Sequence, residues 1–162
     1  MERLQDCWWA ADEIGGPIQI ERHFDGRRFR CFGDRPRNLD DMLRRVVAAY
    51  PANEAVVEGP RRICFSDLDD LVDRVAANLS AAGVAPGDRV ALLLGNRWEA
   101  VVSLFGCVRL GAICVPLGTR QRKPELEFQL NDCGAAVLIV DAELAAVAPT
   151  AATVGSLRLR IV

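Results

Sequence analysis

Two polar stretches carry residue types that could hold an anion. Asn96 and Arg97 follow the apolar run RVALLL at residues 89–94, and the stretch GTRQRK at residues 118–123 follows the run AICVPL at residues 112–117. Backbone N–H groups at the start of a helix, with a guanidinium beside them, suit phosphate oxygens. The three cations of the second stretch could meet phosphate groups in the same way. The candidate cofactor-binding residues are therefore Asn96, Arg97, Thr119 and Arg120.

Each stretch also has a purely structural interpretation. Asn96 and Glu99 resemble a helix capping box, whose side chains satisfy the same N–H groups that an anion would need. The cations of residues 118–123 could instead remain solvated or form surface ion pairs. Ligands of open α/β sheets bind at the carboxyl edge of the strands, where the loop of residues 118–123 is expected. The sequence leaves both interpretations open.

Other catalytic signatures are missing from the chain. It contains no GxxxxGK[ST] phosphate loop, no GxGxxG after the first parallel strand and no GxSxG nucleophile elbow. The single histidine, His23, has no Ser or Cys partner in a nucleophile context, so we expect an exposed turn residue. The six cysteines form no CxxC pair, which argues against a zinc site of ordinary ligand spacing. We assign no catalytic residue and no metal ligand.

The composition indicates one compact and nearly neutral domain. Of the 162 residues, 51% are apolar, and 20 basic side chains face 22 acidic ones. The apolar fraction excludes a disordered chain, and the charge balance offers no basic surface for nucleic acid. The apolar stretch at residues 100–108 is too short for a transmembrane helix, which needs about 20 residues. Without a signal peptide, we expect a cytoplasmic protein whose cysteines are reduced, with Cys64, Cys107 and Cys114 lying in apolar runs.

Residues 1–37 are expected to form an N-terminal arm or hairpin. The segments IQIERHF and RRFRCF flank Asp25 and Gly26, a pair that suits the positive φ angles of a type I′ turn. The alternative is an irregular arm.

Residues 38–162 read as an α/β subdomain. Asn38 can cap a first helix, which Pro51 ends, and residues 54–58 and 61–65 predict two paired strands. Ser66 is expected to cap the next helix. On the solvated side of that helix, Asp70 and Arg74 are expected to form an i,i+4 pair.

From residue 89 the apolar runs alternate between strand and helix. Strands that alternate with helices predict a mostly parallel sheet flanked by helices. Because no helix follows the final strand, one sheet face would be uncovered, and we expect the chain to be the front part of a longer protein. A natural domain that ends on an edge strand is the alternative. The expected strands are residues 89–94, 112–117, 135–140 and 157–162, and the expected helices are residues 97–110, a helix opening at Pro124 and a short Ala-rich helix at 142–147.

The run from Asn38 to about Val140 resembles the N-terminal subdomain of the AMP-forming adenylating enzymes, which include acyl-CoA synthetases, luciferases and peptide-synthetase adenylation domains. Three segments carry the resemblance, namely RRICFSDLDDLVDRVAANLSAAGVAPGDRVALLLGN, VRLGAICVPLGTR and RKPELEFQLNDCGAAVLIV. Peptide synthetases usually have an Asp after Val-Pro. This chain has Leu117-Gly118-Thr119-Arg120 there, which is similar to acyl-CoA synthetases.

The resemblance implies an enzyme that uses ATP, Mg²⁺ and coenzyme A to activate a carboxylic acid, such as a fatty acid, and to transfer the acyl group to the thiol. The family's Ser/Thr/Gly-rich phosphate loop, its adenine- and ribose-binding segment and its catalytic lysine have no counterpart in these residues. We therefore expect this chain alone to be inactive, to bind no cofactor tightly and to self-associate through exposed apolar surface. A free-standing, non-catalytic α/β module that binds a partner is the alternative.

Overall fold

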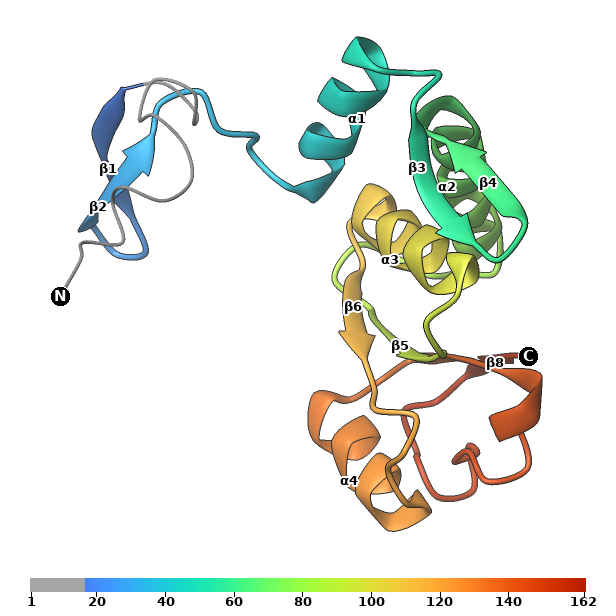
Figure 1. The fold of residues 1–162 in the computed structure, drawn as a ribbon. Coiled ribbons are helices and arrows are strands. Elements are labelled where there is room, and N and C mark those ends of the chain that lie inside the picture. The colour runs from blue at the N-terminus through green and yellow to red at the C-terminus, as the bar shows by residue number, and fades with distance from the viewer. Residues whose placement is uncertain (1–16) are drawn as a thin grey trace, which may run out of the picture. The chain divides into compact units, whose positions relative to one another are not determined.

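The computed structural model describes residues 17–162, which divide between two compact units. Residues 17–38 belong to the first unit, and residues 39–162 form the second (Figure 1). Cys7 and the other residues of the first sixteen lie outside the described residues. The expectation for residues 1–37 is therefore compared with the structure only from Pro17 onward.

The first unit contains the hairpin that Asp25 and Gly26 predict. Strands β1 (Ile18–His23) and β2 (Arg27–Phe32) pair antiparallel. Asp25 and Gly26 take φ angles of 60° and 86°, and the Arg27 N–H donates to the Phe24 carbonyl at 3.4 Å. Because the ladder pairs His23 with Arg27, Phe24 is an extra residue in the loop, and it too adopts a positive φ.

The second unit begins with helix α1 (Leu39–Ala49), the antiparallel strands β3 (Glu54–Glu58) and β4 (Arg61–Cys64), and helix α2 (Phe65–Ala81). The predicted cap at Ser66 is wrong, because Cys64 is the N-cap residue and Ser66 lies inside the first turn. The N–H groups of Phe65 and Ser66 donate to the carbonyls of Asn53 and Pro51, both at 3.0 Å, so the preceding loop supplies the acceptors.

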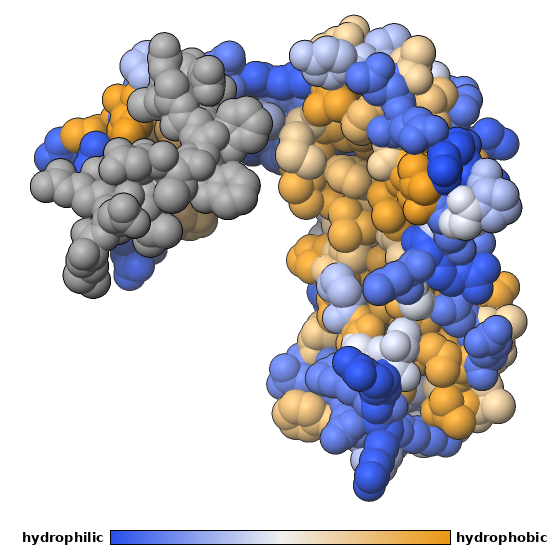
Figure 2. Space-filling view, viewed as in Figure 1, coloured by the Kyte–Doolittle hydropathy of each residue, from blue (hydrophilic) through white to orange (hydrophobic). Residues whose placement is uncertain are grey.

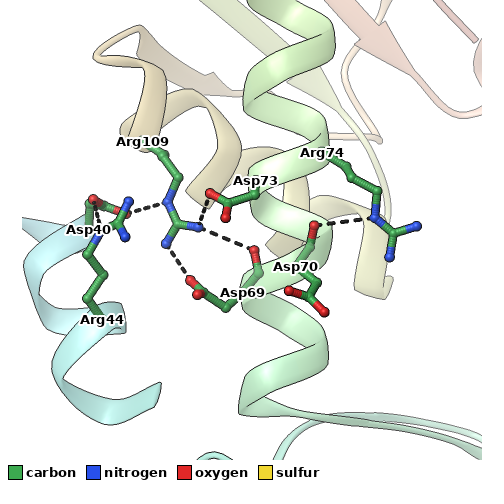
Figure 3. Close-up of polar contacts among 7 residues, drawn as sticks. All are labelled: Asp40, Arg44, Asp69, Asp70, Asp73, Arg74 and Arg109. Carbon is green, nitrogen blue, oxygen red and sulfur yellow. Dashed lines mark hydrogen bonds and ion pairs between the residues drawn. The ribbon is translucent and has the colours of Figure 1, made fainter. Parts of the chain in front are cut away.

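The predicted ion pair between Asp70 and Arg74 is also not formed. Arg74 Nε donates instead to the main-chain carbonyl of Asp70 at 3.3 Å (Figure 3). Both side chains are on the solvated side of α2, where a surface ion pair gains little over water.

A four-stranded parallel sheet forms the centre of the second unit, as predicted. Its order is β6-β5-β7-β8, with every neighbouring pair parallel. Helix α3 connects β5 to β6, and helix α4 then carries the chain past β5 to its other side (Figure 1). The predicted Ala-rich helix is a single 3₁₀ turn, η2 (Ala142–Leu144). The bounds are β5 (Arg89–Leu93), α3 (Trp98–Leu110), β6 (Ile113–Pro116), α4 (Lys123–Cys133), β7 (Val137–Val140) and β8 (Leu159–Ile161).

The alternation of side chains along β5 gives the sheet two covered faces. Val90 and Leu92 pack with α2 and α3, whereas Ala91 and Leu93 pack with α4. All four side chains are buried. Such a strand is apolar on both faces, which explains why the sequence shows one continuous apolar run there.

Helix α3 lies against α2 at very short range. A Cβ built on Gly106 would lie 2.5 Å from Val75 Cγ1, so only glycine permits this approach. A third apolar cluster joins α1, β4, α2 and α3 through Leu43, Ile63, Leu68, Val72 and Val102. These contacts fix the position at which α3 starts, above the end of β5.

The second unit also exposes apolar side chains. Figure 2 shows apolar surface over α1 and α3, and Leu39 and Met42 of α1 are exposed. Ile113 on the edge strand β6 is 52% exposed. Among residues 17–162, no helix combines the length and the apolar character needed to cross a bilayer.

Candidate functional site

The strand order creates a crevice at the carboxyl ends of β5 and β7. From β5 the chain passes through α3 to β6 on one side, whereas the chain after β7 continues to β8 on the other side. Connections that leave adjacent strands in opposite directions open a crevice, which is the usual ligand position in such sheets. A cavity of about 460 Å³ lies there. Its apolar lining includes Val75, Leu79, Leu94, Val102, Ile139 and Val140, and its polar lining includes Asn78, Arg97, Glu99, Ser103 and Asp141.

Asp141, the first residue after β7, holds the loop that follows β5. Its Oδ2 accepts the Gly95 N–H at 2.7 Å, and its Oδ1 accepts Arg97 Nη1 at 3.0 Å. Arg97 also donates to Glu99, from Nε to Oε2 and from Nη2 to Oε1, both at 3.1 Å. The hydrogen bond to Glu99 and the charges of both carboxylates raise the pKa of Arg97. The Arg97 charge is therefore shared by two acidic partners.

The start of α3 is held by an acceptor from β3. The Trp98 N–H donates to Glu58 Oε2 at 2.8 Å, and the Arg61 guanidinium lies 4.1 Å from the centroid of the Trp98 ring. The predicted capping box of Asn96 and Glu99 is wrong. Arg97 is the N-cap residue and makes no side-chain cap, Asn96 is exposed, and Glu99 turns toward Arg97.

Thr119 and Arg120 lie in an exposed turn between β6 and α4. The turn is closed within itself, since Gln121 Oε1 accepts the Gly118 N–H and the Gly118 carbonyl accepts the Gln121 N–H, both at 3.1 Å. Within residues 17–162, Arg120 makes no ion pair. Parallel pairing of β5 with β6 places this loop at the same sheet edge as Asn96 and Arg97, as expected.

The four predicted residues do not converge on one cavity. Arg97 lines both the 460 Å³ cavity and a smaller hollow of about 280 Å³ on the β3 side, and Asn96 lines only the smaller hollow. Thr119 and Arg120 line neither. The arrangement at Arg97 also does not fit a phosphate group, because its guanidinium and the Trp98 N–H already donate to carboxylates. The cofactor-binding role of Asn96, Arg97, Thr119 and Arg120 stays a prediction.

Glu58 and Asp141 are the residues that the sequence analysis missed. Asp141 had a visible signal, because it directly follows a buried strand at the carboxyl edge of a predicted parallel sheet. Glu58 had none. It reaches α3 from 40 residues away, through a ribbon whose packing the sequence pattern does not specify.

Comparison with known proteins extends these observations. The profile described as AMP-binding enzyme matches residues 43–161. The long-chain-fatty-acid–CoA ligase FadD13 of Mycobacterium tuberculosis (strain H37Rv) is 39% identical over 113 residues, which covers 68% of this chain and 22% of the relative. The feruloyl-CoA synthase of Amycolatopsis sp is 41% identical over 105 residues, or 65% of this chain and 21% of the relative.

A solved structure shows the same fold. The N-terminal domain of FACL13 from Mycobacterium tuberculosis aligns with 77% of this chain and 33% of that chain, with a TM-score of 0.73 and 36% identity. The present chain thus spans about a fifth of the length of the curated relatives.

Proposed function

Because the chain belongs to the AMP-binding enzyme family and covers its N-terminal part, we propose that the whole protein is an AMP-forming ligase that joins a carboxylic acid to coenzyme A. The observation that carries this proposal is the family match over residues 43–161, which includes the whole parallel sheet. A carboxylate is a poor electrophile, because its oxygen is a poor leaving group. ATP would turn that oxygen into part of an acyl-adenylate with release of pyrophosphate, and the thiol would then displace AMP.

We propose a fatty acid as the acid substrate. The support is twofold: relatives named as long-chain-fatty-acid ligases, and the mainly apolar lining of the cavity at the carboxyl ends of β5 and β7. Apolar surface in a cavity favours an apolar ligand, since binding removes that surface from water.

We further propose that Thr119 and Arg120 face phosphate or adenylate groups in the whole protein. Their loop is exposed at the carboxyl edge, and Arg120 has no partner charge among residues 17–162. Arg97, by contrast, is committed to Asp141 and Glu99 and would maintain the loop after β5.

The experiment uses the whole protein that carries these residues, and the 162-residue chain in parallel. Each is incubated with ATP, Mg²⁺, coenzyme A and one acid from a panel of palmitate, ferulate and acetate. We expect the whole protein to release AMP and pyrophosphate in an acid-dependent manner, fastest with palmitate, and the 162-residue chain to release none. ADP formation, or AMP release independent of the acid, would contradict the ligase assignment.

The loop assignment has its own test. Arg120→Gln in the whole protein should raise the KM for ATP several-fold with a smaller effect on kcat. The control is Arg74→Gln, which removes an exposed arginine from α2 and should leave both constants unchanged. An unchanged KM in the Arg120→Gln variant would remove the residue from the proposed site.

A further inference from the structure

Three side chains of types that can bind metals lie on one face of the hairpin in the first unit. Glu21 and His23 are two residues apart on β1, so they share a face of the ribbon. Cys31 on β2 pairs with Gln19, which places it on the same face, diagonal to Glu21. One ligand atom from each side chain lies within 4.8 Å of the others, and all three residues are half-buried.

We propose that Glu21, His23 and Cys31 form a Zn²⁺ site. A carboxylate, an imidazole and a thiolate are the ligand types that zinc takes in proteins, and three protein ligands leave a fourth position for water. Donor atoms around a tetrahedral zinc lie roughly 3.3–3.8 Å apart, given bonds of about 2.0–2.3 Å. Glu21 Oε2 and His23 Nε2 now lie 2.7 Å apart, so zinc binding would require the three half-buried side chains to rotate until the donors reach these separations.

A cation already lies against two of these ligands. Arg35 donates to Glu21 through Nη1 and Oε1 at 2.6 Å and through Nη2 and Oε2 at 2.8 Å. Arg35 Nη2 also lies 3.5 Å from His23 Nε2, which is itself 2.7 Å from Glu21 Oε2. The guanidinium thus stands where a metal bound to Glu21 and His23 would stand.

Zinc and Arg35 therefore compete for the same position. A metal held by Glu21 Oε2 and His23 Nε2 displaces Arg35 Nη2, while Nη1 can keep its bond to Oε1 and orient the carboxylate from outside. Cys31 releases its thiol proton to the solvent when its sulfur binds Zn²⁺, so binding weakens as the pH falls.

The test is a titration of the 162-residue chain at pH 7.5 with Zn²⁺ by calorimetry and with Co²⁺ by absorption. We expect one equivalent of Zn²⁺ to bind, and Co²⁺ to give a thiolate charge-transfer band in the near ultraviolet. Cys31→Ser should abolish that band, and His23→Gln should weaken Zn²⁺ binding at least tenfold. Arg35→Gln should tighten it, because a competing cation is removed.

Cys133→Ser is the matched control, since Cys133 is a half-buried thiol at the end of α4, in the second unit. It should leave both titrations unchanged, and circular dichroism should show that each variant keeps the wild-type fold. The proposal is overturned if neither the wild type nor the Arg35→Gln variant binds Zn²⁺ at about 100 µM. It is equally overturned if the Cys31→Ser and His23→Gln variants bind as tightly as the wild type.

Discussion

Arg109 on α3 and Asp40 on α1 are 69 residues apart in the sequence and are joined by a hydrogen bond of 2.7 Å between Nε and Oδ1. The same guanidinium donates to Asp69 Oδ1 at 2.6 Å and Asp73 Oδ1 at 2.7 Å, both on α2 (Figure 3). Only 6% of the Arg109 side chain is exposed. One cation thus links the end of α3 to both α1 and α2.

Removal of this cation should destabilise the chain. Arg109→Met leaves Asp69 and Asp73 without their cation and leaves Asp40 with Arg44 alone. The loss of a buried ion-pair partner costs about 3 kcal/mol in the free energy of unfolding. Urea denaturation followed by circular dichroism measures the change. Arg74→Met is the control, because Arg74 is exposed and bonds only a main-chain carbonyl, and it should change stability by no more than about 0.5 kcal/mol. Equal stabilities of the two variants would contradict the role given to Arg109.

Asp40 should make stability depend on pH in the acid range. Burial alone raises the pKa of Asp40, but hydrogen bonds from Arg44 and Arg109, with their charges, outweigh it and lower the pKa below its ordinary value. A carboxyl whose pKa is lower in the folded state stabilises the fold above its unfolded pKa of about 3.9, and this contribution is lost as the pH falls through the folded value.

Asp40→Asn removes that contribution and tests whether stability falls with pH for the reason given. Urea midpoints measured from pH 7 to pH 3 should fall less steeply for Asp40→Asn than for the wild type. Asp132→Asn changes an exposed carboxylate on α4, and its urea midpoints should vary with pH as those of the wild type do. A wild-type curve that is flat down to pH 3 would show that Asp40 contributes nothing.

Glu58 should stabilise the start of α3 through its carboxylate oxygen. Glu58→Ala leaves the Trp98 N–H without its acceptor and should cost about 1 kcal/mol, as the loss of a helix cap does. Glu58→Gln keeps an acceptor oxygen and should recover most of that loss. Asn96→Ala should be neutral, because Asn96 is exposed and does not cap the helix. A larger loss for Asn96→Ala than for Glu58→Ala would restore the capping box that the structure replaces.

The open edge of the sheet should promote self-association. Strand β6 has a neighbour only in β5 and carries the exposed Ile113, and such edges pair with other chains. Light scattering coupled to size exclusion should show species larger than a monomer at about 100 µM, and Ile113→Lys should reduce them. Ala146→Lys adds the same charge at an exposed position away from the edge strand, and it should leave the amount of these larger species unchanged. A monomer at every concentration would contradict this prediction.

The order and type of the elements were predictable because local chemistry marks them. Gly83, Gly111 and Gly134 all take positive φ angles just after α2, α3 and α4, and glycine is the residue that most readily ends a helix in this way. The continuous apolar runs gave the buried parallel strands, since a strand covered on both faces has no alternation to show. The order of the strands within the sheet, by contrast, follows from how the helices pack, so it cannot be predicted from short stretches of the sequence.

The candidate site was less predictable, because its contacts join residues that are distant in sequence. The Asn96 and Glu99 spacing suggested a local cap, but Glu58 and Asp141 supply the acceptors from 40 and 46 residues away. Likewise, Cys31 approaches Glu21 and His23 only through the register of the hairpin. Spacing rules that compare neighbours along the chain do not detect such groupings.

The position of β5 between β6 and β7 has a consequence for the nascent chain. Strand β6 can pair with β5 soon after it leaves the ribosome, but Val137, the first residue of β7, follows Leu93 by 44 positions. At about 5–20 residues per second, one side of β5 waits about 2–9 s for its neighbour. During that interval β5, which carries four buried apolar side chains, has an unpaired edge, which makes residues 89–93 the segment where a chaperone would be needed first.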